Sequence, residues 1–180
     1  MALDFNKAAK SLLLDLINTK ATRALSEEEL QFGTPQASSE HEKNTVIQLN
    51  AAPEAPNLQG AQQFFYNRLA LSDVFADVTG DVTFELPHGT DSIQASELVS
   101  KLVTKFGLAS LTGEIQEETI QLSAGTVGQV TLNAIENGLV YTGTLQVALT
   151  YAAAPKDDLA TVLANNVAEG FEKPTVSVVG

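Results

Sequence analysis

Apolar and polar residues alternate along two runs that flank Asn137-Gly138, between Gly128 and Tyr151. In the second run, one face of the chain carries only Leu145, Val147, Leu149 and Tyr151. Strict alternation of this kind is typical of a half-buried strand. Asn-Gly between two such runs favours a type I′ turn, because both residues tolerate a positive φ angle. The pattern therefore predicts a β-hairpin.

Apolar residues that recur at three- and four-residue spacing predict two helices, over Asp4–Asn18 and Asp91–Phe106. Each begins with an aspartate that can cap the free amides of a first turn, and Gly107 is a natural stop after the second. In the first helix, Leu13 and Leu14 widen the apolar stripe, so we expect this helix to be buried on more than one side.

Short apolar or alternating runs between turn residues predict the other elements. The predicted strands are Leu30–Pro35, Thr45–Ala51, Gln59–Leu71, Asp81–Pro87 and Ile115–Leu122. Ser26–Glu29 has the spacing of a capping box and predicts one helical turn, whereas Gln36–Asn44 is polar and predicts a loop. Lys156–Phe171 carries a weaker helical pattern after a boundary at Ala152–Pro155.

The two halves of the chain resemble each other. Leu49-Asn50-Ala51 has a counterpart in Leu132-Asn133-Ala134, and Gly60 then falls where Gly143 falls, with no gap. A predicted helix precedes each hairpin. We therefore predict an α+β fold of two tandem, similar helix–strand–β-hairpin units, with antiparallel sheet packed against helices. Two unrelated hairpins in one α+β domain are the alternative.

The predicted organisation has three parts. A first helix/β unit covers residues 1–72, and a second covers residues 73–153 and packs with the first as one domain or stands beside it as another. Residues 154–180 form a C-terminal extension or arm.

The composition excludes several classes of function. The chain has 180 residues, no cysteine and a formal net charge of −12, so a disulfide frame, a thiol nucleophile and a cysteine metal site are excluded. An acidic surface repels phosphate, so we expect no nucleic-acid partner. The apolar runs are too short to span a bilayer, and the N-terminus lacks the pattern of a signal peptide, so we expect no membrane partner and a protein made in the cytoplasm.

No catalytic motif is present. His41 and His88 each stand alone in a predicted turn, and the sequence has no metal-binding or phosphate-binding motif. Carboxylates are plentiful, but nothing in the pattern singles out a pair. We therefore predict a protein that is not an enzyme and has no catalytic residue, cofactor or metal, with a two-carboxylate hydrolase as a minor alternative.

Surface contacts are the remaining route to function. Three consecutive aromatic residues, Phe64 to Tyr66, place rings on both faces of a strand, as core or as an exposed contact. The termini Met1–Asn6 and Pro174–Gly180 are candidate arms, and the valine-rich second arm could add a strand to a neighbouring subunit. The candidate partner-contact residues are Phe65, Tyr66, Tyr141, Val176, Val178 and Val179.

Four short motifs follow one another in the first half: Leu12–Asn18, Leu25–Pro35 (LSEEELQFGTP), Asn44–Ala51 (NTVIQLNA) and Phe65–Leu69 (FYNRL). This series resembles the first module of a family of virion structural proteins of large tailed bacteriophages. Modules of that family run helix, TFG-x-P strand, NT-x-V-x-V-x-A strand, and a strand with YNR. The second half is similar to their second module over Leu98–Leu122, Val130–Ala134 and Leu139–Val147.

The resemblance covers Phe5 to Tyr151, and Gln62-Gln63 replaces an apolar and a small residue of the family pattern. It implies a non-enzymatic virion subunit, made in the host bacterial cytoplasm, that contacts major capsid or tail proteins and forms a homo-oligomer in the particle. A capsid-decoration position and a tail or baseplate position are both consistent with it. A soluble carbohydrate- or protein-binding β module is the alternative.

Overall fold

The computed structural model describes residues 3–122, 128–157 and 162, and its fold is α+β, as predicted. Its helical elements are α1 (Ala9–Asn18), η1 (Glu40–Glu42), α2 (Leu71–Val74), η2 (Ala76–Asp81), α3 (Ala95–Phe106) and η3 (Ala109–Leu111). Its strands are β1 (Leu30–Phe32), β2 (Gln36–Ala37), β3 (Thr45–Ala51), β4 (Ala61–Tyr66), β5 (Leu69–Ala70), β6 (Thr83–Leu86), β7 (Ser92–Gln94), β8 (Thr119–Gln121), β9 (Gly128–Asn133), β10 (Tyr141–Thr142) and β11 (Thr144–Tyr151).

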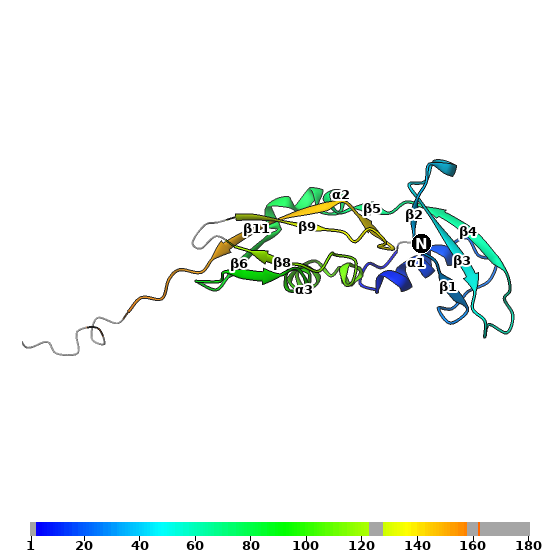
Figure 1. Cartoon of the computed structure of the whole chain (residues 1–180), viewed down its shortest axis with the longest axis horizontal. Coiled ribbons are helices and arrows are strands. Elements are labelled where there is room, and N and C mark those ends of the chain that lie inside the picture. Colours follow the sequence, from blue (N-terminus) through cyan, green and yellow to red (C-terminus); the bar gives the residue numbers. More distant parts are fainter. Residues whose placement is uncertain (1–2, 123–127, 158–161, 163–180) are drawn as a thin grey trace, which may run out of the picture.

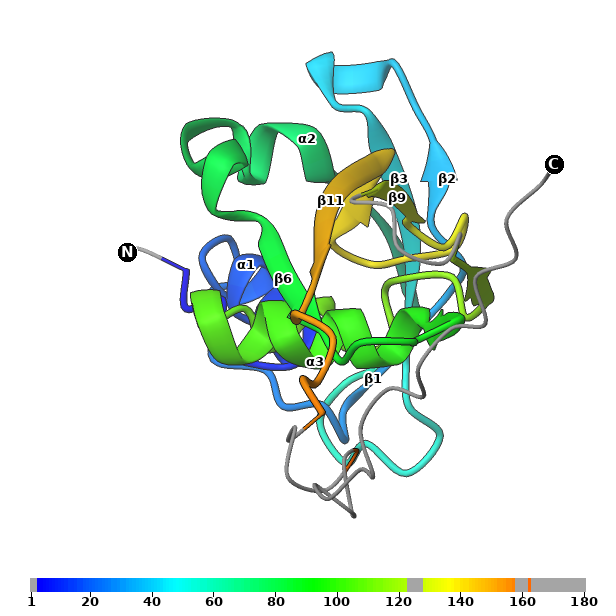
Figure 2. The same ribbon diagram turned by 90° about the vertical axis from the view of Figure 1, so that its left-hand side faces the viewer.

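Two main sheets lie toward opposite ends of an elongated molecule (Figure 1). In the first sheet, β3 pairs antiparallel with β4 on one side and with β1 and β2 on the other. In the second, β11 lies between β9, which is antiparallel to it, and β6, which is parallel. Figures 1 and 2 show α2 and α3 on opposite sides of the second sheet. The short parallel pair β5–β10 joins the two halves.

Each sheet has its own apolar core, and α1 contributes to both. Leu12 belongs to the larger core around the second sheet, whereas Leu13, Leu14 and Ile17 belong to the smaller core under the first sheet. The expectation that α1 is buried on more than one side is therefore confirmed. The helix holds the two halves together by shared burial.

The two hairpins have the same register. Leu49 pairs with Gln62 in the first, and Leu132 pairs with Leu145 in the second, each residue lying 83 positions after its counterpart. The turns also agree, because the N–H of Ala51 donates to Gly60 and the N–H of Ala134 donates to Gly143, both at 2.9 Å. The likeness predicted from the sequence thus extends to backbone geometry in the hairpins. The division into two tandem units, and its boundaries, stay predictions.

Both hairpins require a glycine at the same place. Gly60 has φ 87° and Gly143 has φ 73°, and a Cβ at either would meet no atom within 4 Å. Alanine should therefore cost only backbone strain, about 1–2 kcal/mol at each position. Urea unfolding of the two variants checks this, and asparagine at the same positions should cost less because it tolerates this conformation. A loss at only one position would contradict the equivalence.

The helices begin later than predicted. α1 begins at Ala9, and the Asp4 carboxylate accepts the N–H of Asn6 in a turn before the helix, so it does not cap α1. α3 begins at Ala95, because β7 occupies the residues after Asp91 and pairs with β8. The residues before each helix make other contacts: Phe5 accepts the N–H of Ser110, and β7 pairs with β8. Helical periodicity alone had included these residues in the helices.

The turn at Asn137-Gly138 is not of type I′. Neither residue has a positive φ angle, and the chain turns earlier, where the N–H of Gly138 donates to the carbonyl of Ile135 at 3.1 Å. The residues after this turn run to β10, and β11 begins only at Thr144. The predicted hairpin strands are confirmed, and the predicted turn between them is wrong.

The two predicted arms have different outcomes. Leu3 and Phe5 pack against the larger core, and the carbonyl of Phe5 accepts the N–H of Ser110 at 3.1 Å, so the described part of Met1–Asn6 is docked and is not a free arm. Pro174–Gly180 lies outside the described residues, as does most of the predicted helix Lys156–Phe171. In the part of the chain that the structure describes, no helix is long and apolar enough to cross a membrane.

Candidate functional site

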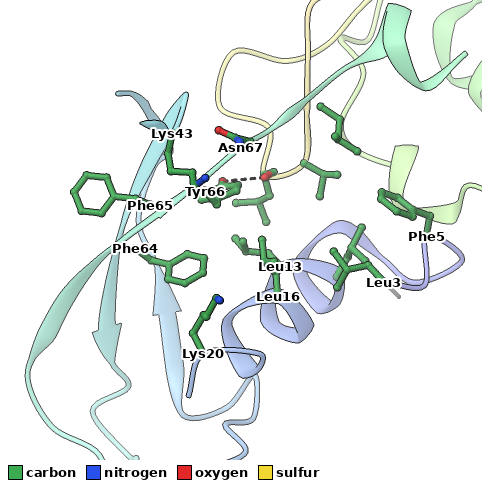
Figure 3. A pocket seen from close by; sticks show the side chains of 14 residues that line it. Leu3, Phe5, Leu13, Leu16, Lys20, Lys43, Phe64, Phe65, Tyr66 and Asn67 are labelled. Atoms are coloured by element: carbon green, nitrogen blue, oxygen red, sulfur yellow. Dashed lines mark hydrogen bonds between the residues drawn. The ribbon is translucent and has the colours of Figure 1, made fainter. Parts of the chain in front are cut away.

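An apolar groove of about 380 Å³ lies between α1 and β4, at the joint between the two halves (Figure 3). We call it the α1–β4 groove. It is lined by Leu3, Phe5, Leu12, Leu13, Leu16, Lys20, Lys43, Phe64, Phe65, Tyr66, Asn67, Leu69, Leu139 and Val140. Most of these side chains are hydrocarbon. The groove therefore suits an apolar occupant more than a polar small molecule.

Helix α1 supplies one wall of the groove. Leu13 and Leu16 lie one helical turn apart and face β4, whereas Phe64 points from β4 toward them (Figure 3). Residues three and four apart share a face of a helix, which also places Lys20 at the end of this wall. Phe64 and Tyr66 stack with ring centroids 5.9 Å apart and form the facing wall.

The segment Leu139–Val140 forms a third wall, and the Glu114 side chain holds it in place. Glu114 is 4% exposed, and its two carboxylate oxygens accept the N–H groups of Leu139, Val140 and Tyr141 at 2.9, 2.9 and 3.2 Å. A carboxylate that accepts several backbone N–H groups forms strong, charge-assisted hydrogen bonds. This buried acid is therefore a structural anchor for the wall of the groove.

The YNR motif ties the strand end to both halves of the protein. Asn67 accepts the N–H of Asn44 at 2.9 Å, and Asn44 accepts the N–H of Arg68 at 2.8 Å. The Arg68 guanidinium then donates to the carbonyls of Glu136 and Gly138 at 2.9 and 3.0 Å. These contacts fix β4 against the segment that leads to the third wall. The hydrogen bonds of Asn67 and Arg68 therefore give the YNR motif a structural role.

Tyr66 and Tyr141 are buried, so they are not the surface contacts that the sequence suggested. The Tyr66 hydroxyl donates to the carbonyl of Leu139 at 2.9 Å, and the Tyr141 hydroxyl lies 2.6 Å from that of Ser110. Burial raises the pKa of both phenols, an effect that the Ser110 hydrogen bond partly offsets at Tyr141. Both rings are core residues.

The buried phenols predict a loss of stability in alkali. An unfolded tyrosine ionises near pH 10, while the fold raises the pKa of Tyr66 and Tyr141 and so favours their neutral forms. The stabilisation is complete below about pH 10 and is lost as the pH rises above it. Thermal unfolding at several pH values should show this fall, and the double variant Tyr66→Phe/Tyr141→Phe should show a shallower one. An unchanged slope would contradict the assignment.

Phe65 also lines the groove, but it is half-buried and its ring points away from Leu13 and Leu16 (Figure 3). Its ring packs edge-on against His41, with centroids 4.7 Å apart. Of the predicted contact residues, Phe65 alone keeps a partly exposed side chain in the described chain. Val176, Val178 and Val179 lie outside the described residues.

Two lysines, Lys20 and Lys43, are among the residues that line the groove. In the view of Figure 3 the Phe64 ring lies between Lys20 and Lys43. The ion pairs around α1 involve other cations, Lys7 with Asp15, Lys10 with Glu27 and Arg23 with Glu29. Within the described ranges, Lys20 and Lys43 form no ion pair. In a chain of net charge −12, this is a local positive site beside apolar surface.

Sequence reasoning missed the groove and most of its lining. Leu13, Leu16 and Lys20 follow helical spacing, and this signal was available, but their partner strand could be known only from the fold. In residues 3–122, 128–157 and 162, no group of three or more His, Asp or Glu side chains is arranged to hold a metal ion.

The sequence model of a family of unknown function, DUF7941, matches residues 2–179, so the chain belongs to that family. Neither a curated protein nor a solved structure matches the chain.

Proposed function

We propose that this chain is a non-enzymatic structural component of a tailed-bacteriophage virion that acts through protein–protein contacts. The observation that carries the proposal is the α1–β4 groove, an apolar groove of about 380 Å³ beside β4, a strand that pairs only with β3 among the described residues. Exposed apolar surface that is rimmed by polar residues is typical of protein–protein contact sites. The resemblance of the sequence motifs to tailed-phage virion proteins supports the same role.

The contacts between the two halves of the body suit a rigid structural subunit. Helix α1 belongs to both cores, Arg68 and Tyr66 reach from the first half to the loop of the second, and β5 pairs with β10 across the joint. These links resist motion between the halves. The subunit would contact major capsid or tail proteins and other copies of itself, and the site of action would be the virion.

The alternative, a carbohydrate-binding module, is less well supported. Sugar sites combine flat aromatic rings with several polar groups that fix the hydroxyls. Here Phe64 is directed into an apolar groove, and the neighbouring lining comes from leucine and phenylalanine side chains. A protein segment suits this lining better.

Purified particles test the proposal. Virions are banded on a density gradient from a lysate of the infected host, and the chain is sought by mass spectrometry. We expect it to co-purify in a constant ratio to the major capsid or tail protein. Antibody labelling in electron micrographs then distinguishes a capsid position from a tail or baseplate position. If the chain is recovered only in the soluble fraction of the lysate, the proposal is wrong.

A further inference from the structure

Strand β4 has an unpaired outer edge. In the described part of the chain it pairs only with β3, so every second residue directs its N–H and C=O groups away from the sheet. Its sequence, Ala-Gln-Gln-Phe-Phe-Tyr, contains no charge and no proline, which are the residues that usually protect an edge. The edge is therefore suited to accept another extended strand.

Apolar surface follows this strand along its length. The α1–β4 groove lies beside Phe64–Asn67, and a second depression of about 390 Å³ lies beside Gly60–Gln62. Both are lined by Lys20 and Phe64, so they meet at the middle of the strand. An extended segment that lay on the edge would place alternate side chains over these two depressions.

One segment of this chain has the matching pattern. In residues 174–180 the sequence Pro-Thr-Val-Ser-Val-Val-Gly puts Val176 and Val178 on one side of an extended strand and carries no charged side chain. Glu169, Glu172 and Lys173 precede it and carry a net charge of −1, opposite in sign to the two lysines at the groove. Valine favours strands, and the alternation suits a surface that is apolar on one side.

The described chain leaves the body far from the groove. β11 ends at Tyr151, and the exposed residues Ala153–Asp157 lead away from the body at the end opposite to β4 (Figure 1). This direction favours a neighbouring molecule as the recipient. We propose that the outer edge of β4 and its two depressions bind the valine-rich segment 175–179 of a second copy of this chain.

Such a contact is head-to-tail, because the donor and recipient surfaces differ. Head-to-tail contacts close into rings or continue as filaments. This inference rests on the proposed function and names the first partner of the groove, namely the next copy in the particle.

The absence of cysteine from the chain allows a direct test. One full-length variant carries Gln62→Cys on β4, and another carries Val178→Cys. Mixed and oxidised, the two should form a disulfide that only molecules in trans can make, and mass spectrometry identifies the linked peptides. Thr131→Cys, at an exposed position of β9, replaces Gln62→Cys in the matched control.

Equal linking to the control position would overturn the inference. So would a bond that forms within single molecules when one chain carries both substitutions, since this would place the segment on its own groove. A disulfide of Gln62→Cys to another virion protein in assembled particles, in place of the segment, would assign the groove to that protein and also overturn it.

Sedimentation supplies a second measurement. Assembly of the full-length chain should be lost in Val176→Asp/Val178→Asp and retained in Thr175→Asp/Ser177→Asp, which adds equal charge on the other side of the strand. A wild-type chain that stays monomeric at its highest soluble concentration contradicts the inference. If the chain is present in purified particles but the cross-link does not form, the inference is wrong and the proposed function is still supported. If cross-linked oligomers form but the chain is absent from particles, the inference is supported and the proposed function is wrong.

Discussion

Replacing Glu114 by alanine should lower the free energy of unfolding by about 3–5 kcal/mol, because three backbone N–H groups lose a charged acceptor. Val140 and Tyr141 are buried, so their N–H groups would lie unpaired away from solvent. Urea or guanidinium unfolding followed by circular dichroism measures the loss.

Two further variants separate the hydrogen bonds from the bulk of the side chain. Glu114→Gln keeps the shape but offers one acceptor and turns an NH₂ group toward an N–H, so it should recover only part of the loss. Glu136→Ala removes an exposed carboxylate from the same loop and should change stability by less than about 0.5 kcal/mol. Equal effects of Glu114→Ala and Glu136→Ala would show that charge, and not the hydrogen bonds, matters.

Substitution of the buried Glu114 should also affect the groove. Leu139 and Val140 form one wall of the groove, and their backbone position depends on Glu114. A milder variant such as Glu114→Gln should therefore weaken binding at the groove before the protein unfolds. Glu114 is buried, but it affects the groove because it holds the segment Leu139–Val140, which forms one groove wall.

The strand pattern was predictable because burial has period two. β3 occupies the predicted residues Thr45–Ala51, and the pairing of β9 with β11 follows the predicted alternation. Each of these strands is long enough for the pattern to identify its buried face without knowledge of the rest of the fold.

The turn at Asn137-Gly138 shows where local rules fail. The sequence favours a two-residue turn there, but Glu114, 23 positions earlier than Asn137, binds the following N–H groups and holds the loop open. A Cβ at Gly138 would come within 2.7 Å of the Glu114 carboxylate, so this glycine is needed for close approach and not for a positive φ. No local pattern encodes such a contact.

Two of the candidate contact residues, Tyr66 and Tyr141, are buried for a related reason. Aromatic residues in a strand can face a partner or a core, and sequence does not say which elements cover each face. Tyr66 is covered by α1 and the loop at Leu139, whereas Tyr141 is enclosed by the larger core. Phe65 is only half-buried, and its ring packs edge-on against His41.

Leu12→Ala and Leu13→Ala should each cost about 2–5 kcal/mol, although the two side chains belong to different cores. Leu12 is 3% exposed and Leu13 is 2% exposed, so truncation of either leaves a cavity. Lys10→Ala, on the exposed side of the same helix, should cost little, because a surface ion pair contributes less than about 1 kcal/mol.

The form of the unfolding transition is the informative result. Because α1 is shared and Arg68 and β5 cross the joint, we expect both leucine variants to unfold in one transition at a lower temperature. Calorimetry tests this, since the measured enthalpy should equal the van't Hoff enthalpy for a single cooperative unit. A Leu13→Ala variant that shows two transitions, of which only the first is shifted, would instead mean that the smaller core unfolds alone. A single transition would instead mean that the two cores, and with them β4 and β11, belong to one cooperative unit.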